Sequence, residues 1–224
     1  MKKKSPLFFL LVFCLLGSQV QGQSYKQDRR FKAALMIGMN LSQVDGDKHS
    51  GYDKIGLQGG LRGITILNDE LELSFELLFS QKGSKSKDLT EAFNRPGARK
   101  PLNMRLNYME VPVLINYRIE KLDRNFYKFE LHGGLSYSRL LNYSISEVNA
   151  RVENETVFNE IAQFFSRNDI SLILGTKVNF SPHVGFALRH TVALNKFYHD
   201  PDALNVQIKG LRNYHFSLLT IYSF

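Results

Sequence analysis

Four glutamates have the type and spacing to do chemistry in this chain: Glu72, Glu76, Glu110 and Glu130. Two carboxylates that lie together can act as a general acid and a general base. The same alternating stretches also carry five cations on their polar faces, namely Arg62, Arg118, Lys128, Lys177 and Arg189. Because buried charges have to be paired, we interpret the whole set as a structural charge network and assign no catalytic residue.

Other reactive residue types occur without the spacing that their chemistry requires. The histidines, His49, His132, His183, His190, His199 and His215, show no metal-ligand pattern. Asp45-Gly46-Asp47 lacks the rest of a calcium loop, so a turn is favoured there. Gly134–Ser138 lacks the second glycine of a nucleophile elbow, and neither a phosphate loop nor a dinucleotide fingerprint occurs. We therefore expect no enzyme activity, no metal site and no cofactor.

Eight segments alternate apolar and polar residues with a period of two, which indicates strands. They are residues 31–41, 55–67, 71–80, 109–118, 127–137, 170–180, 184–194 and 211–224. A helical period would scatter Glu72 and Glu76 among the apolar residues instead of placing them on one face. The sequence therefore predicts eight strands, each with one apolar face.

The connections between these segments are short and long in turn. The short ones are 68–70, 119–125 and 181–183, and the long ones are 42–54, 82–103, 142–169 and 196–210. An even-stranded barrel of the bacterial outer membrane has this arrangement, with tight periplasmic turns, long extracellular loops and both termini on one side.

Two barrel classes fit the alternation, a soluble barrel with an apolar lumen and a membrane barrel with an apolar exterior. The apolar faces carry large side chains that would overfill a small lumen, and tyrosines and phenylalanines recur near strand ends, as an interfacial belt requires. We therefore predict an all-β fold, an eight-stranded antiparallel transmembrane barrel. The final strand ends on an aromatic residue, and its outward set forms a predicted assembly signal: Tyr214, Phe216, Leu218, Tyr222 and Phe224.

The first 22 residues resemble a signal peptide. Three lysines precede Leu7–Leu16, an apolar run too short to span a bilayer as a helix, and a plausible cleavage point lies before Gln23. An uncleaved anchor is the disfavoured alternative. We expect a signal peptide at 1–22, a short lead at 23–30 and the barrel domain at 31–224. Cys14 would leave with the leader, and the loss of three lysines would lower the net charge from +8 to +5.

Two features interrupt this regular pattern. Pro112 lies inside a predicted strand, where it removes a ladder donor, so a bulge or a locally open pair is expected. In the connection 142–169, apolar residues at helical spacing follow the capping-type sequence Ser144–Glu147 and predict a helix. They are Ile145, Val148, Val152, Ile161 and Phe165. The helix has two interpretations: a lid or docking element at the outer mouth, or a helix that packs its apolar side on the barrel rim.

Five motifs together resemble the outer-membrane β-barrel domain family of Bacteroidetes, often labelled PorT-family or porin-family. They are Gly38–Ser42, Gly51–Leu61, Glu76–Gly83, Tyr108–Pro112 and Gly133–Tyr137. The resemblance spans roughly residues 31–224 and implies an eight-stranded barrel. It implies no single function, because the label covers many different proteins. Its named member is associated with a protein-secretion and gliding apparatus.

The function expected is that of a small closed barrel with a structural or interaction role in the outer membrane, since eight strands leave no aqueous channel. An accessory role in a secretion or transport machinery is the alternative. A lipid-modifying enzyme is a third class, supported by analogy alone. The expected partners are outer-membrane lipid and lipopolysaccharide, the barrel-assembly machinery and, as further candidates, other envelope proteins. The scattered basic residues do not favour nucleic acid.

Overall fold

The computed structural model describes residues 30–47, 51–85, 102–123, 126–147, 158–199 and 210–224. The predicted signal peptide and almost all of the lead lie outside these residues. The strands are β1 Phe31–Asp45, β2 Lys54–Ile66, β3 Leu71–Lys85, β4 Leu102–Asp123, β5 Phe126–Glu147, β6 Asn168–Asn179, β7 Val184–Ala193, β8 Tyr198–His199 and β9 Gly210–Ser223. Two short helical turns lie between β5 and β6, α2 Phe158–Ile161 and the 3₁₀ turn η3 Ala162–Phe164.

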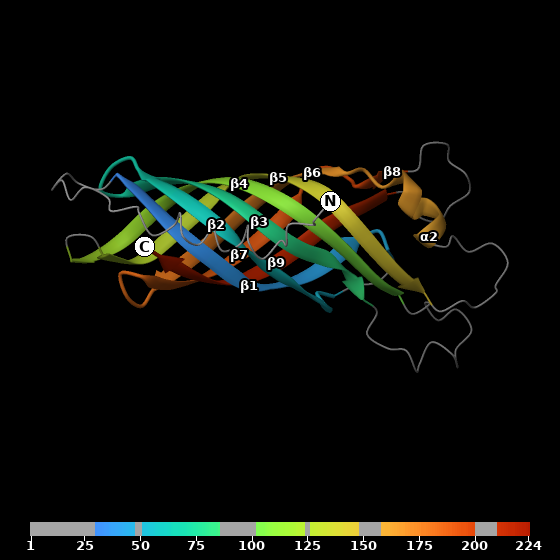
Figure 1. Cartoon of the computed structure of the whole chain (residues 1–224), viewed down its shortest axis with the longest axis horizontal. Coiled ribbons are helices and arrows are strands. Elements are labelled where there is room, and N and C mark those ends of the chain that lie inside the picture. Colours follow the sequence, from blue (N-terminus) through green and yellow to red (C-terminus); the bar gives the residue numbers. More distant parts are fainter. Residues whose placement is uncertain (1–29, 48–50, 86–101, 124–125, 148–157, 200–209) are drawn as a thin grey trace, which may run out of the picture.

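Eight of these strands form a closed antiparallel ring (Figure 1). Neighbours in the chain pair with each other, and β9 closes the ring by pairing with β1 from Ala34↔Ser223 to Asp45↔Arg212. At the end of the seam, the backbone N–H of Phe224 donates to the Ala33 carbonyl at 2.9 Å. The two-residue β8 only extends the start of β9 and is not part of the ring. The predicted eight-stranded barrel is confirmed.

The register around the ring fixes how strongly the strands tilt. Direct partners lead from Ala33 in β1 around all eight strands to Gln43 in β1, a shift of ten residues. The intermediate partners are Gly63, Phe75, Val113, Leu135, Leu172, Val192 and Tyr214. With ordinary strand spacing and rise, this shift corresponds to a tilt of about 40° and an interior that side chains can fill.

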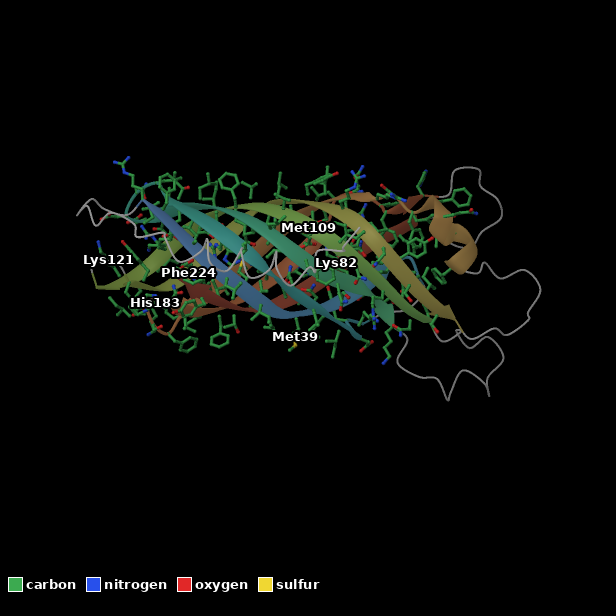
Figure 2. The ribbon with its side chains drawn as sticks, viewed as in Figure 1. Met39, Lys82, Met109, Lys121, His183 and Phe224 are labelled. Carbon is green, nitrogen blue, oxygen red and sulfur yellow. The ribbon has the colours of Figure 1, made fainter. Side chains whose placement is uncertain are left out.

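The apolar faces point outward along the whole barrel, as predicted. In β3, Phe75 and Leu77 are about half exposed, whereas Glu72 and Glu76 between them are buried. The other strands repeat this pattern, and side chains project from the outer surface along its length, Met39 among them (Figure 2). An exposed apolar belt around a polar interior is the arrangement that a bilayer requires and that water would penalise.

The two ends of the barrel differ in the way expected from the connection lengths. Lys121, His183 and Phe224 lie at the end with the tight turns, and α2 and β8 lie at the other end (Figures 1 and 2). The strands run further than the sequence suggested, because β3 continues to Lys85 and β4 and β5 each span 22 residues. About 9–11 residues suffice to cross a bilayer, so both strands extend beyond it.

Pro112 is accommodated by a locally open ladder. The β3–β4 register runs from Phe75↔Val113 to Leu78↔Glu110 with the same offset, and the two pairs between them are absent. Pro112 keeps its place opposite Ser136 of β5, and its ring is buried. An open pair, and not a bulge, is therefore the accommodation at this residue.

The helix predicted after Ser144 is wrong. Ser144–Glu147 belong to β5, where they pair with Leu102–Arg105 of β4. The described part of the connection contains only the single turn α2 followed by η3. Val148 and Val152 lie outside the described residues. Neither described helical segment is long and apolar enough to cross a membrane.

Candidate functional site: the lumenal network and the outer mouth

The centre of the lumen is occupied by one glutamate held between two arginines. Glu76 of β3 accepts two hydrogen bonds from Arg189 of β7, at 2.6 and 2.8 Å. The Nε atom of Arg62, on the neighbouring strand β2, lies 3.5 Å from the same carboxylate. All three side chains are almost completely buried. The structure thus brings these three residues, all expected on the lumenal face, together inside the barrel.

Arg189 crosses the lumen because a glycine leaves room for it. Gly175 of β6 faces inward and pairs with both His132 of β5 and Arg189 of β7. A Cβ atom at Gly175 would lie 2.6 Å from His132 Nε2 and 2.9 Å from Arg189 Cγ. In the structure Arg189 Nε donates to His132 Nε2 at 3.1 Å. His132 therefore orients an arginine through this hydrogen bond.

A second group of ion pairs fills the periplasmic end. Arg118 of β4 donates to Glu72 at 2.9 Å, and also to the carbonyls of Asn68 and Asp69 at 2.7 Å each. It thereby fastens the β2–β3 turn to the barrel wall. Lys177 of β6 donates to Glu130 of β5 at 2.8 Å, directly across the strand pair. These four residues were predicted to be lumenal, and the structure buries all of them.

Between the Glu76 group and the outer end, the lumen contains the pair Lys82–Glu110, of which the sequence predicted only Glu110. Glu110 forms an ion pair with Lys82 and accepts hydrogen bonds from Gln58 and Ser138 at 3.3 Å each. Lys82 was assigned to a loop, although Ser80, Lys82 and Ser84 continue the inward phase of β3. That continuing alternation was the signal available in the sequence. We call this pair, together with the ion pairs of Glu72, Glu76 and Glu130, the lumenal network.

Lys128 was assigned to the lumenal network, and this is wrong. Its side chain is 45% exposed and lies 3.8 Å from the equally exposed Glu120. The backbone of Glu120 has a φ of 59°, and at this end of the hairpin Tyr127 is buried instead, with its ring 4.4 Å from the Arg118 guanidinium. The change in side-chain direction at the strand end thus places Lys128 outside.

A buried carboxylate above the lumenal network was also missed. Asp169, the last residue of a predicted loop, faces inward as the second residue of β6 and is 1% exposed. It accepts a hydrogen bond from Asn213 of β9 at 3.1 Å, and Asn213 also donates to the Tyr108 hydroxyl at 3.2 Å. The inward phase of Ser171 and Lys177 extends back to Asp169 and could have identified it.

The outer end of the lumen is closed by apolar side chains, which we call the outer-mouth cluster. Inward-facing strand residues line it: Val44, Leu102, Met104, Leu106, Tyr108, Leu140 and Leu211. Connecting segments fill it with Ile161, Ala162, Phe165, Phe197 and Tyr198. Phe165 packs edge-on against Phe197 with ring centroids 5.1 Å apart. Ile161 and Phe165, both from the β5–β6 connection, are thus buried against inward-facing strand residues.

The arrangement holds the lumenal charges in fixed, paired positions. Each of the four lumenal glutamates has a cationic partner within ion-pair distance. A carboxylate held in this way is a poor general acid or base, and the outer-mouth cluster separates it from the cell surface. Within the described ranges, no group of three or more His, Cys, Asp or Glu residues could hold a metal ion.

A closed antiparallel ring with a lipid-compatible exterior and a filled, charge-paired interior defines an outer-membrane β-barrel. A family model described as "Outer membrane protein beta-barrel domain" matches residues 19–199, and the chain belongs to this family. Its location in the outer membrane follows. A comparison with curated proteins gave no match.

Solved structures of similar architecture are also barrels, at low sequence identity. Ail, the attachment invasion locus protein of Yersinia pestis, is 12% identical over 86% of this chain and 98% of its own, with a TM-score of 0.45. Neisserial surface protein A is 12% identical over 87% of this chain and 97% of its own, with a TM-score of 0.42. OprG from Pseudomonas aeruginosa is 14% identical over 87% of this chain and 94% of its own, with a TM-score of 0.35.

Proposed function

We propose that this protein is a non-conducting barrel with a structural or interaction role at the cell surface, and not a general diffusion pore. The outer-mouth cluster carries the proposal, because it fills the extracellular end of the lumen with buried apolar side chains. Below it, the Arg189–Glu76 pair joins opposite walls of the ring. An ion would have to displace both barriers to cross.

The length of β4 and β5 supports the interaction part of the proposal. Their outer ends pair from Leu102↔Glu147 to Asn107↔Asn142, beyond the outward apolar residues Met109–Ile119 of β4. This ribbon carries the exposed side chains of Arg105, Tyr143 and Ser144. A hydrogen-bonded ribbon that extends beyond the apolar belt offers a surface to a partner without a change in the barrel itself.

Planar-bilayer recording of the purified protein tests the closed state. We expect no stable, large conductance at low voltage. A large porin in the same bilayer is the positive control and should conduct. A steady open channel would contradict the proposal.

The finer assignments are separate proposals. Membership of a PorT-like branch and an accessory role in secretion rest on the motif resemblance, and crosslinking in native membranes with mass spectrometry tests them. Repeated recovery of one envelope complex, crosslinked through the outer ribbon, would favour the accessory role. The lack of enzyme activity is likewise proposed, and assays of lipid hydrolysis and acyl transfer with the purified barrel test it.

A further inference from the structure

Three cations gather on the outer rim of β2–β4, and we call them the outer basic patch: Lys54, Lys85 and Arg105. Lys85 pairs with Asn103, and Gly83 pairs with Arg105, so Lys85 and Arg105 are diagonal neighbours on adjacent strands. Lys54 is buried at the inward-facing start of β2, and its ammonium reaches the same rim, where it donates to Asn103 Oδ1 at 2.6 Å. The charges of Arg105 and Lys85 act on the Lys54 ammonium. The patch is therefore one electrostatic site.

No carboxylate of the described residues forms an ion pair with the outer basic patch. Exposed cations at the periplasmic end behave differently, since Lys121 lies 3.4 Å from Asp69 and Lys128 lies 3.8 Å from Glu120. Lys85 and Arg105 are both exposed. Like charges placed side by side repel each other, so among the residues that the structure describes the patch is a local concentration of positive charge that favours an anionic ligand.

The outer basic patch borders the lipid-facing surface. Ile55, the residue after Lys54, and Leu57 point outward and are each 65% exposed. This part of β2 lies close against β3, because a Cβ atom on Gly56 would be 2.2 Å from the Gln81 carbonyl oxygen. An apolar surface thus ends at a cluster of cations, at the barrel end that carries the long connections. An amphiphile with acyl chains and an anionic headgroup matches both parts.

We propose that the outer basic patch binds the phosphate group of a phosphorylated glycolipid in the outer leaflet. Arg105 supplies a planar fork that can donate two hydrogen bonds to one phosphate, and Lys85 supplies a point charge beside it. Lys54 adds positive potential from the adjacent strand, while the acyl chains lie over Ile55 and Leu57. The inference does not depend on the proposed closed state of the lumen, because Lys85 and Arg105, which contact the phosphate, are exposed on the exterior.

The test is lipid retention by the full-length barrel, purified in a phosphate-free maltoside detergent and measured by native mass spectrometry. The probes are bisphosphorylated lipid A, the same lipid after dephosphorylation, and inorganic phosphate as a competitor. The variant is K85Q/R105Q, and the matched control is K121Q/K128Q, which removes two exposed cations at the opposite end. We expect the wild type and the control to retain phosphorylated lipid. We expect the variant to bind this lipid at least about tenfold more weakly.

Equal retention by K85Q/R105Q and the control would overturn the proposal, and so would equal retention of dephosphorylated lipid. Competition by inorganic phosphate at the concentration of the lipid would indicate a free-anion site and would overturn the assignment to a lipid. Heat-modifiable gel mobility reports whether each variant is folded. If the double variant does not fold, the single exposed substitutions K85Q and R105Q are compared with K121Q in the same way.

Discussion

Replacement of Glu76 by glutamine should destabilise the barrel more than any other single change to a lumenal carboxylate. Glu76 neutralises two cations, Arg189 through two hydrogen bonds and Arg62 at 3.5 Å, and all three groups are buried. Loss of one partner of a buried pair costs about 3–5 kcal/mol, because the remaining charge is left without compensation. Since E76Q leaves two uncompensated arginines, we expect a loss near the upper end of this range.

The assay is urea unfolding of the barrel in lipid vesicles, with heat-modifiable gel mobility as the measure of the folded fraction. E70Q is the matched control, because Glu70 is an exposed residue of the β2–β3 turn, and its change should fall within about 0.5 kcal/mol. The triple variant E76L/R62M/R189M removes all three charges together and should be more stable than E76Q. If E76Q unfolds at the same urea concentration as E70Q, the lumen is hydrated and the reasoning from buried ion pairs is refuted.

Three further predictions test the exterior, the outer mouth and the seam. F75R should lower the unfolding free energy by about 2–4 kcal/mol, whereas F31R at the end of the barrel should cost about 0–1 kcal/mol, and equal costs would contradict the orientation. F165A should cost about 3 kcal/mol in the same unfolding assay, whereas F164A, at an exposed neighbour, should cost less than about 0.5 kcal/mol. Deletion of Phe224 removes the hydrogen bond to Ala33 and an interfacial aromatic ring, and should lower the folded fraction in outer-membrane preparations. The control is a variant that lacks two residues of the 86–101 connection. If its folded fraction equals that of the Phe224 deletion, the role of Phe224 in assembly is contradicted.

The strand phases could be read from the sequence because a bilayer imposes them directly. Outward residues must be apolar wherever lipid covers them, and the period of two then fixes every inward position in the same strand. Arg62, Glu76 and Arg189 were identified as lumenal in this way. Their partners could not be read from the sequence, because β3 and β7 face each other only after the ring has closed with its particular register.

The misassigned residues lie where the bilayer no longer constrains the pattern. Lys82 and Asp169 belong to strand ends outside the apolar belt, where polar residues occur on both faces and resemble a loop. Lys128 lies where a local backbone change at Glu120 reverses the phase. The outer-mouth cluster draws on β1, β4, β5, β9 and two connections, so no single periodicity could reveal it. The apolar spacing from Ile145 onward is compatible with a helix, whereas in the structure Ile145 pairs with Met104 of β4.

The position of Glu76 connects the lumenal network to the strength of the barrel wall. The two pairs missing from the β3–β4 ladder are those of Glu76 and Leu77, because Pro112 on β4 has no N–H to donate. The β3–β4 wall thus lacks ladder pairs at the level where Arg189 and Arg62 hold Glu76 from β7 and β2. A buried ion pair often adds little net stability compared with apolar packing. At this level its effect is positional, since it ties β3 to two other strands where the ladder to β4 is open.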